Sequence, residues 1–264
     1  MAYRPISCRM ECRGKGDAAR KGCTWVHPPC ARLERADSVP DKRVLITGAG
    51  GALGMATMAR LTAQGWRVAP VAGRHGASDA PGWFGPVDLA DRDAAAQVVA
   101  QAARALGGLD GVVHLAGGFA MQRLLECTPQ DWRAMQAGNV ESLIAVVQAA
   151  VPHMAEGGAI VAVGGMAAAR AGAGMAAYAS AKSAVLRVVE ALGVELAPRG
   201  IRANAVLPGV IDTPANRRDM PRADPAKWTH PDAIADVIAF LLGPQSRAIN
   251  GAGVPVNNPA GPAA

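Results

Sequence analysis

The sequence predicts an α/β fold in which a parallel sheet of about seven strands is covered by helices on both faces. Two observations predict this fold. From residue 42 onward, short apolar runs alternate with longer segments of helical periodicity, as in consecutive βαβ units. A glycine-rich stretch, Thr47 to Gly54, lies directly between the first apolar run and the first helical segment. A strand, a glycine turn and a helix in this order are typical of a doubly wound, Rossmann-type sheet.

The first half of the pattern predicts four strands and two helices. We expect strands at 43–46, 67–72, 85–89 and 110–116, and helices at 55–64 and 92–106. Asp91 has the side chain of a helix N-cap, and Gly107 and Gly108 are suited to end the second helix. The elements alternate without a gap long enough for a separate domain.

The second half continues the alternation. We expect helices at 128–151, 176–196 and 232–242, and strands at 159–163, 201–207 and 253–256. Pro129 follows Thr128 and stands at the first helical position, which proline favours. The polar, proline-rich segment 212–231 is expected to be a loop. The sequence contains no linker or internal repeat, so residues 41–264 are predicted to form one domain.

Residues 1–40 differ in composition from the rest of the chain. They hold four of the five cysteines and eight of the 27 Lys/Arg residues, so the net charge of +6 belongs largely to this segment. Its cysteine spacings match no common zinc finger, and it lacks the apolar region of a secretory signal. We expect an N-terminal extension that is disordered or lies upstream of the true start.

The composition also bounds the partners and the compartment. A single cysteine in residues 41–264 fits a reducing cytoplasm. The basic residues form no stripe with interleaved aromatic residues, and no apolar run of about 18 residues is present. We therefore expect neither a nucleic acid nor a membrane as partner. No cluster has the spacing of metal ligands, so no metal is expected.

Tyr178 and Lys182 are the strongest candidates for chemistry. Residues four apart lie one turn apart on the same helix face. The Tyr178 phenol has an ordinary pKa near 10, and a neighbouring ammonium favours its ionised form. Such a pair can transfer a proton to a substrate while a nicotinamide cofactor transfers hydride.

These residues resemble the short-chain dehydrogenase/reductase family. The family pattern Thr-Gly-x-x-x-Gly-x-Gly is met by Thr47, Gly48 and Gly54, with Ala52 at its middle glycine. Tyr178 and Lys182 match the catalytic pair of the family. The resemblance implies an NAD(P)H-dependent oxidoreductase acting on a small-molecule substrate.

The resemblance extends to the turn after the fourth strand and to the helix beyond it. Ala116 and Gly117 match the family's Asn-Asn-Ala-Gly turn, but His114 and Leu115 replace its two asparagines. Asn139 falls where the family keeps an asparagine that holds a water for proton relay. A buried asparagine satisfied by a neighbouring backbone is the alternative. His114 is expected to be a hydrogen-bonded structural histidine rather than a catalytic one.

The resemblance also implies which residues contact the cofactor: Gly48, Gly50, Gly51, Leu53, Gly54, Arg74, Asp88, Leu89, Ala116, Gly117, Tyr178, Lys182, Pro208, Gly209, Val210 and Thr213. NAD-preferring members place an acid after the second strand, where this chain has Ala72 and Gly73 followed by Arg74. The missing carboxylate and the nearby arginine favour NADP(H) over NAD(H).

The catalytic serine of the family is missing. Its position, thirteen residues before Tyr178, is Gly165. Ser180 lies on another side of the helix and should not replace it. The dihydropteridine reductase-like subgroup also lacks this serine, and the segment from Asp212 to Trp228 is similar to that subgroup. The alternative is that this segment has a substrate-loop sequence shared by many bacterial reductases. The missing acid after the second strand departs from the subgroup, which keeps it for NADH. Gly165, Met166, Met175 and Trp228 are candidates for the substrate wall.

The expected activity is hydride transfer to a small conjugated imine, quinonoid or carbonyl substrate. A ketone or aldehyde reductase of the 3-oxoacyl type, with the serine role compensated, is the alternative. A protein that senses NADP(H) without turnover is a second alternative. The alanine-rich helices at 128–151 and 176–196, together with the resemblance, imply a homodimer or homotetramer.

Overall fold

The computed structural model describes residues 9–12, 23–26, 41–73 and 80–258. The chain divides into two compact units, 1–39 and 40–264. In the first unit, β1 (Arg9–Cys12) pairs with β2 (Cys23–Val26) as antiparallel strands. The other residues of the expected N-terminal extension lie outside the described residues.

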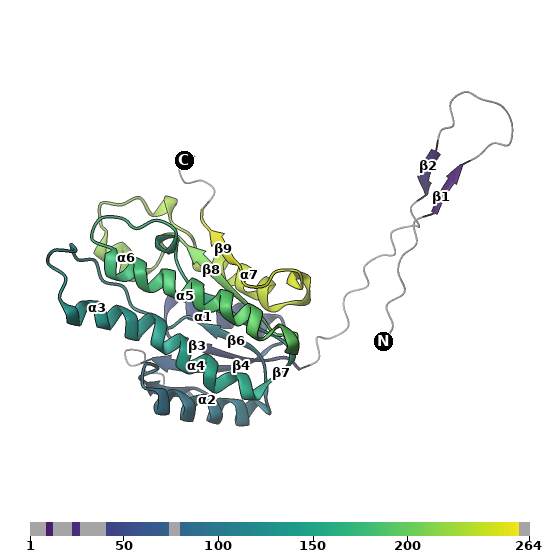
Figure 1. The fold of residues 1–264 in the computed structure, drawn as a ribbon, viewed down its shortest axis with the longest axis horizontal. Helices are drawn as coiled ribbons and strands as arrows, with labels where there is room; N and C mark the ends of the chain where they lie inside the picture. The colour runs from purple at the N-terminus through teal and green to yellow at the C-terminus, as the bar shows by residue number, and fades with distance from the viewer. Residues whose placement is uncertain (1–8, 13–22, 27–40, 74–79, 259–264) are drawn as a thin grey trace. The chain divides into compact units, whose positions relative to one another are not determined.

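The second unit is built on a parallel sheet of seven strands in the order β5-β4-β3-β6-β7-β8-β9 (Figure 1). The strands are β3 (Arg43–Thr47), β4 (Arg67–Gly73), β5 (Phe84–Val87), β6 (Leu109–His114), β7 (Met154–Val163), β8 (Arg202–Pro208) and β9 (Gly253–Val256). The strand order reverses between β3 and β6, and ligands bind doubly wound sheets at the carboxyl ends of such strands. The predicted fold class is confirmed.

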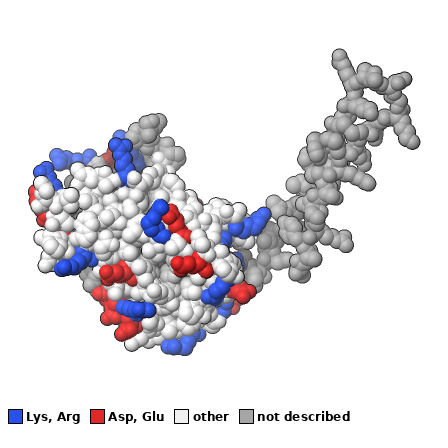
Figure 2. Space-filling view, in the orientation of Figure 1, with Lys and Arg blue, Asp and Glu red and all other residues white. Residues whose placement is uncertain are grey.

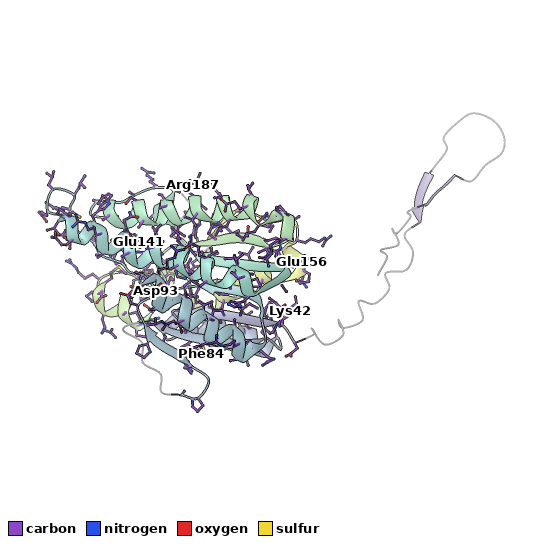
Figure 3. All side chains as sticks on the ribbon, turned by 60° about the horizontal axis from the view of Figure 1, so that its bottom comes forward. Lys42, Phe84, Asp93, Glu141, Glu156 and Arg187 are labelled. Carbon is purple, nitrogen blue, oxygen red and sulfur yellow. The ribbon has the colours of Figure 1, made fainter. Side chains whose placement is uncertain are left out.

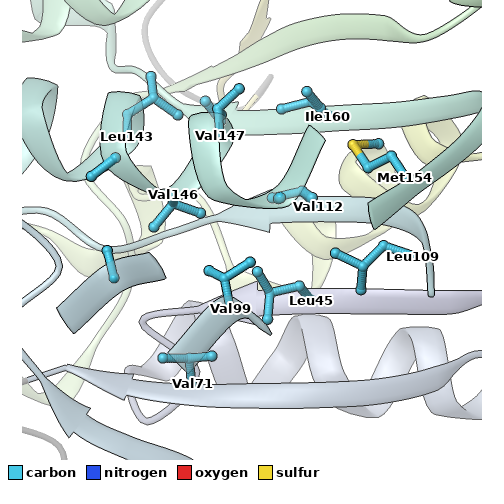
Figure 4. Packing of buried hydrophobic residues seen from close by; sticks show 14 of the residues in the cluster. Leu45, Val71, Val99, Leu109, Val112, Leu143, Val146, Val147, Met154 and Ile160 are labelled. Carbon is cyan, nitrogen blue, oxygen red and sulfur yellow. The ribbon is translucent and has the colours of Figure 1, made fainter. Parts of the chain in front are cut away.

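Helices cover both faces of this sheet. They are α1 (Ala52–Ala63), α2 (Arg92–Leu106), α3 (Pro129–Gln136), α4 (Ser142–Ala150), α5 (Ala176–Glu195), α6 (Pro214–Asp219) and α7 (Pro231–Leu242). One core packs α2, α4 and α5 against the sheet, around residues such as Leu45, Val112 and Ile160 (Figure 4). The other core packs α1 and α7 against the opposite face.

The helix ends follow the caps that the sequence predicts. The Asp91 carboxylate accepts hydrogen bonds from the backbone N–H groups of Asp93 and Ala94, at 3.0 and 3.1 Å. Gly107 ends α2 in the left-handed conformation, with a φ of 79°. Thr128 and Asp131 form a reciprocal capping box at the start of α3. These contacts satisfy backbone groups that a helix end leaves without a partner.

Three segments differ from the prediction. The helix expected over 128–151 is divided by a π-helix at Ala137–Glu141. The sequence did not predict this division, because a local change of hydrogen-bond spacing does not alter the spacing of apolar residues. The expected loop at 212–231 contains the short helix α6, which Thr213 caps and Pro214 begins. Strand β7 also begins at Met154, five residues before the expected start.

The surface of the described residues carries charges of both signs. On the face shown in Figure 2, Lys/Arg and Asp/Glu side chains are interspersed among uncharged ones. Figure 3 labels Glu141, the last residue of the π-helix, and Arg187 in α5, and both side chains are exposed. No helix in the described part of the chain is long and apolar enough to cross a membrane.

Candidate active site

The glycine turn after β3 lies against the turn after β6. Gly48 has a φ of +67°, and a Cβ added there would lie 2.8 Å from the backbone nitrogen of Ala116. A Cβ on Gly54 would lie 2.5 Å from the carbonyl oxygen of Ala49. Both neighbours are backbone atoms, so these two positions require glycine. The predicted glycine turn between the first strand and the first helix is therefore confirmed, with Gly54 in the first turn of α1.

The same turn leads into the N-terminus of α1, and the N–H of Gly51 donates a hydrogen bond to the carbonyl oxygen of Gly48 at 3.1 Å. Gly50 and Gly51 are exposed, and Gly51 caps α1 without a side-chain hydrogen bond. The first N–H groups of a helix have no partner within it, and together with the helix dipole they suit an anion such as a pyrophosphate. The side chain of Leu53 is buried in the core, and its predicted contact with the cofactor stays a prediction.

The residues expected around the adenosine half of a cofactor follow β4 and β5. Strand β4 ends at Gly73, where no carboxylate is present and a Cβ would meet nothing within 4 Å. Arg74 lies outside the described residues. The Asp88 carboxylate accepts a hydrogen bond from the backbone N–H of Ala90 at 3.0 Å, and Leu89 packs into the core.

Tyr178 and Lys182 lie together near the start of α5. The Lys182 ammonium donates a hydrogen bond to the carbonyl oxygen of Val163 at 3.0 Å and lies 5.7 Å from the centroid of the Tyr178 ring. Burial lowers the pKa of Lys182 to about 8. Burial also raises the pKa of the Tyr178 phenol, opposite to the direction expected from a neighbouring ammonium. Tyr178 thus keeps its proton at neutral pH, which suits a proton donor.

Asn139 lies within the π-helix and is 1% exposed. Its amide donates to the carbonyl oxygens of Gly118 and Met135, at 3.1 and 2.9 Å, and accepts from the N–H of Gly118 at 3.3 Å. A Cβ on Gly117 would lie 2.6 Å from Asn139 Oδ1 and 3.4 Å from Lys182 Nζ. The structure therefore brings Asn139 and Lys182 to the same turn, although the Asn139 side chain is satisfied by backbone groups.

The position of the missing serine faces the Tyr178 hydroxyl. A Cβ on Gly165 would lie 3.3 Å from Tyr178 Oη, while the Ser180 hydroxyl donates to the carbonyl of Ala177 within its own helix. The prediction that Ser180 does not replace the serine is confirmed. Met166 is 36% exposed beside Gly165.

Two other candidates for the substrate wall pack within the fold. Met175 lies just before α5, where a Cβ on Gly172 would meet its sulfur at 3.2 Å. Trp228 is buried, with 8% of its surface exposed. Its place in the substrate wall stays a prediction, with packing as the alternative.

Phe119 belongs to this site, although the sequence did not place it there. Its ring meets the ring of Tyr178 edge to face, with 4.9 Å between the centroids. Phe119 is nevertheless 58% exposed. The signal in the sequence was an aromatic residue directly after the turn Ala116 to Gly118, and only the fold shows that this turn delivers it to Tyr178.

The segment after β8 lies at the same sheet edge. Pro208 is buried at the end of the strand, whereas Gly209 and Val210 are exposed. The Thr213 hydroxyl accepts a hydrogen bond from the N–H of Asn216 at 3.1 Å and caps α6. Thr213 therefore has a structural task in addition to the cofactor contact expected of it.

His114 is buried at the end of β6, with 2% of its surface exposed. Its Nδ1 lies 3.0 Å from Thr47 Oγ1 and its Nε2 lies 3.3 Å from Ser142 Oγ. Burial, and secondarily the charge of Lys182, lowers the pKa of His114 to about 3. The prediction of a hydrogen-bonded structural histidine is confirmed.

Comparison with known proteins identifies the family. The family model described as enoyl-(acyl carrier protein) reductase matches residues 48–258. The chain belongs to the short-chain dehydrogenase/reductase family.

Members of this family with similar sequences carry different names. L-rhamnose 1-dehydrogenase (NAD(P)(+)) of Azotobacter vinelandii is 32% identical over 82% of this chain and 95% of its own length. The cyclic-di-GMP-binding biofilm dispersal mediator protein of Escherichia coli is 34% identical over 80% of this chain and 93% of its own. A short-chain dehydrogenase of Burkholderia cenocepacia, solved in complex with NADP, is 34% identical with a TM-score of 0.77, covering 84% and 98%.

The protein is accordingly an NAD(P)-dependent oxidoreductase of the short-chain dehydrogenase/reductase family, acting on carbonyl or alcohol substrates. The N-terminus of α1, which follows the exposed residues Gly50 and Gly51, fits a dinucleotide, whose nicotinamide supplies or accepts hydride. Among the described residues, no three His, Cys, Asp or Glu side chains are grouped to hold a metal.

Proposed function

We propose that the protein is an NADP(H)-preferring reductase of a small, planar conjugated imine or quinonoid compound, similar in chemistry to dihydropteridine reductases. The observation that carries this proposal is Gly165. The position that holds a hydroxyl donor in the family pattern here places no polar group beside the Tyr178 hydroxyl. A donor to a developing oxyanion is worth about 10²–10³ in rate. A substrate whose electrons are withdrawn through a conjugated ring needs less of that polarisation.

Tyr178 and Lys182 supply the proton chemistry in this proposal. The Tyr178 phenol, kept protonated by its burial, donates its proton to the substrate nitrogen or oxygen as hydride arrives. The Lys182 ammonium stabilises the phenolate left behind and contacts the nicotinamide ribose. Asn139, beside the same turn, holds the water that links Lys182 to solvent.

The surroundings of Tyr178 support a planar substrate. The exposed ring of Phe119 stands edge to face against Tyr178, and an aromatic face stacks well on a flat conjugated ring. Met166 adds a flexible apolar side chain on the Gly165 side. The lack of a carboxylate at Ala72 and Gly73 supports the preference for the 2′-phosphate of NADP(H).

The test is oxidation of NADPH and NADH, measured side by side, with quinonoid dihydropterin and with a panel of small ketones. A much higher kcat/KM for the pterin than for the ketones, with faster turnover when NADPH is the donor, is the expected result. Turnover of ketones alone refutes the proposed substrate class and favours a carbonyl reductase or alcohol dehydrogenase. The A. vinelandii relative, named as a rhamnose dehydrogenase, is the observation that favours this second candidate.

A binding protein without turnover is the third candidate, favoured by the E. coli relative that is named for binding cyclic-di-GMP. Comparing cells that carry Tyr178→Phe with cells that carry the wild type distinguishes an enzyme from a binding protein. An enzyme loses its biological role with the phenol, whereas a sensor keeps it.

We further propose a homodimer or homotetramer in the cytoplasm. The helices α3, α4 and α5 carry partly exposed apolar side chains, among them Trp132, Ile144 and Val194, which a second copy would cover. The small number of cysteines beyond residue 40 supports a reducing compartment. Light scattering coupled to gel filtration measures the assembly, and a monomer at micromolar concentration refutes it.

A further inference from the structure

His114 connects two parts of the site that are far apart in the sequence. It ends β6, the strand beside β3, and it stands opposite Thr47 in the register of the two strands. Thr47 is the last residue before the glycine turn. On its other side, the imidazole reaches Ser142, the first residue after the π-helix that contains Asn139.

The directions of these hydrogen bonds can be assigned. The Ser142 hydroxyl lies 2.8 Å from the carbonyl oxygen of Gly138, an acceptor, so its single proton is donated there. Ser142 Oγ must then accept a hydrogen bond from His114 Nε2. A neutral imidazole carries one N–H, so its Nδ1 accepts from the Thr47 hydroxyl. Thr47 Oγ1 in turn faces the N–H of Ala116 at 3.5 Å.

Each hydroxyl and each ring nitrogen in this series of hydrogen bonds is therefore assigned as donor or acceptor toward its neighbour. The imidazole is neutral, in agreement with the effect of burial on its pKa, and it is protonated at Nε2. The reverse tautomer would leave Nε2 facing an oxygen without a proton to share. A buried polar group left unpaired costs more than a hydrogen bond gains, so the assigned tautomer is held in place.

We propose that His114 is a positioning residue, a neutral Nε2–H imidazole that fixes the glycine turn relative to the Asn139 turn. Its Nδ1 orients Thr47 and through it the cofactor-binding turn. Its Nε2 orients Ser142 and through it the backbone around Asn139. The catalytic half of this proposal rests on the proposed role of Asn139, whereas the cofactor half rests on geometry and family membership.

Two amide substitutions separate the two contacts. The side-chain amide of His114→Asn ends near the position of Nδ1, so it keeps an acceptor for Thr47 and loses Ser142. The longer amide of His114→Gln reaches the position of Nε2, so it keeps a donor to Ser142 and loses Thr47. One hydrogen bond corresponds to about a 3- to 10-fold effect.

We expect His114→Gln to raise the dissociation constant of NADPH by about 3- to 10-fold with kcat unchanged at saturation. We expect His114→Asn to lower kcat by a similar factor with NADPH affinity unchanged. Ser142→Ala should lower kcat as His114→Asn does, and the double variant should show no further loss. Equal changes of both constants in both amide variants, or no change in either, would overturn the proposal.

A second measurement uses the wild-type chain and needs no substrate. Proton–nitrogen correlation spectra of the histidine rings, with His114 assigned from the His114→Asn variant, should show an Nε2–H tautomer. They should show no titration between about pH 5 and 8. An Nδ1–H tautomer or a titrating ring would refute the proposal.

The two proposals fail differently. If no substrate is turned over while the tautomer and the weakened NADPH binding of His114→Gln are both found, the proposed function fails. The positioning role toward the cofactor is then supported.

Discussion

The sharpest perturbation of this site is Gly165→Ser, which restores the hydroxyl at the family position. Gly165 has a φ of 169° and a ψ of 154°, extended backbone that any residue adopts. The new Cβ would lie 3.3 Å from Tyr178 Oη, 3.9 Å from Lys182 Cγ and 4.0 Å from the carbonyl oxygen of Pro208. The first of these contacts is slightly tight, and a shift of a few tenths of an ångström relieves it. Serine therefore fits without strain.

The expected gain follows from the donor that the hydroxyl provides. Mutational loss of one oxyanion donor costs about 10²–10³ in kcat. We expect Gly165→Ser to raise kcat/KM for simple ketones by about that factor and to change the rate with a conjugated imine by less than about tenfold. The ratio of the rate with ketones to the rate with the imine tests the prediction, because a general change in the enzyme would alter both rates alike.

Gly165→Ala is the matched control, because it adds the same Cβ without the hydroxyl. Both variants and the wild type are assayed for NADPH oxidation with a ketone panel and with quinonoid dihydropterin. NADPH binding is measured to confirm an intact site. If the serine variant binds NADPH and shows no gain on ketones over the alanine variant, the missing hydroxyl does not limit the reaction.

Three further predictions follow from the geometry and the pKa directions. Gly48→Ala should lower the free energy of unfolding in urea by more than Gly65→Ala, because both glycines have a positive φ but only at Gly48 would a Cβ meet backbone atoms. Left-handed strain alone costs about 1–3 kcal/mol. Equal losses of unfolding free energy in the two variants would contradict this prediction. Because the pKa of His114 falls from 6.5 to about 3 on folding, the unfolded chain binds more protons in that window. Stability should then fall as pH drops from 6.5 toward 3, by up to about 1.4 kcal/mol per pH unit; His114→Asn should show a shallower slope, and equal slopes would refute the assignment. The rate of reduction should decline as pH rises through about 8, where Lys182 loses its proton, and a rate that stays level to about pH 10 would count against a charged Lys182.

The sequence predicted the order and type of the main elements because each carries a local signal. Helix ends are set by side chains that contact the backbone within one turn. The structure shows Asp91 and Gly107 at the two ends of α2, and Thr128 and Pro129 at the start of α3. The doubly wound parallel sheet was also predicted, because a strand, a glycine turn and a helix in this order are typical of it, whereas the order of its strands comes from the structure. Periodicity alone could not reveal the π-helix, because apolar spacing does not report which carbonyl each N–H contacts.

The candidate site was predicted to the extent that it depends on spacing along one helix. Tyr178 and Lys182 are four residues apart, and the fold brings them to the edge where Gly48 and Gly117 also lie. Phe119 was missed because its contact with Tyr178 crosses two elements. The same holds for the carbonyl of Val163 that binds Lys182. Contacts between elements depend on strand register and on side-chain direction, and a local sequence pattern predicts neither.

The departures from the family pattern at Gly165 and at His114 have opposite physical character. At Gly165 a side chain is removed beside the reacting hydroxyl, which leaves the backbone relaxed and the substrate less polarised. At His114 a larger side chain is introduced into the core, and all of its polar atoms are paired. An unpaired imidazole there would cost the fold far more than a missing serine does. A substitution at position 165 should therefore change activity with little effect on stability, whereas a substitution at position 114 breaks a contact with Thr47 or Ser142 and should lower stability together with cofactor affinity or kcat.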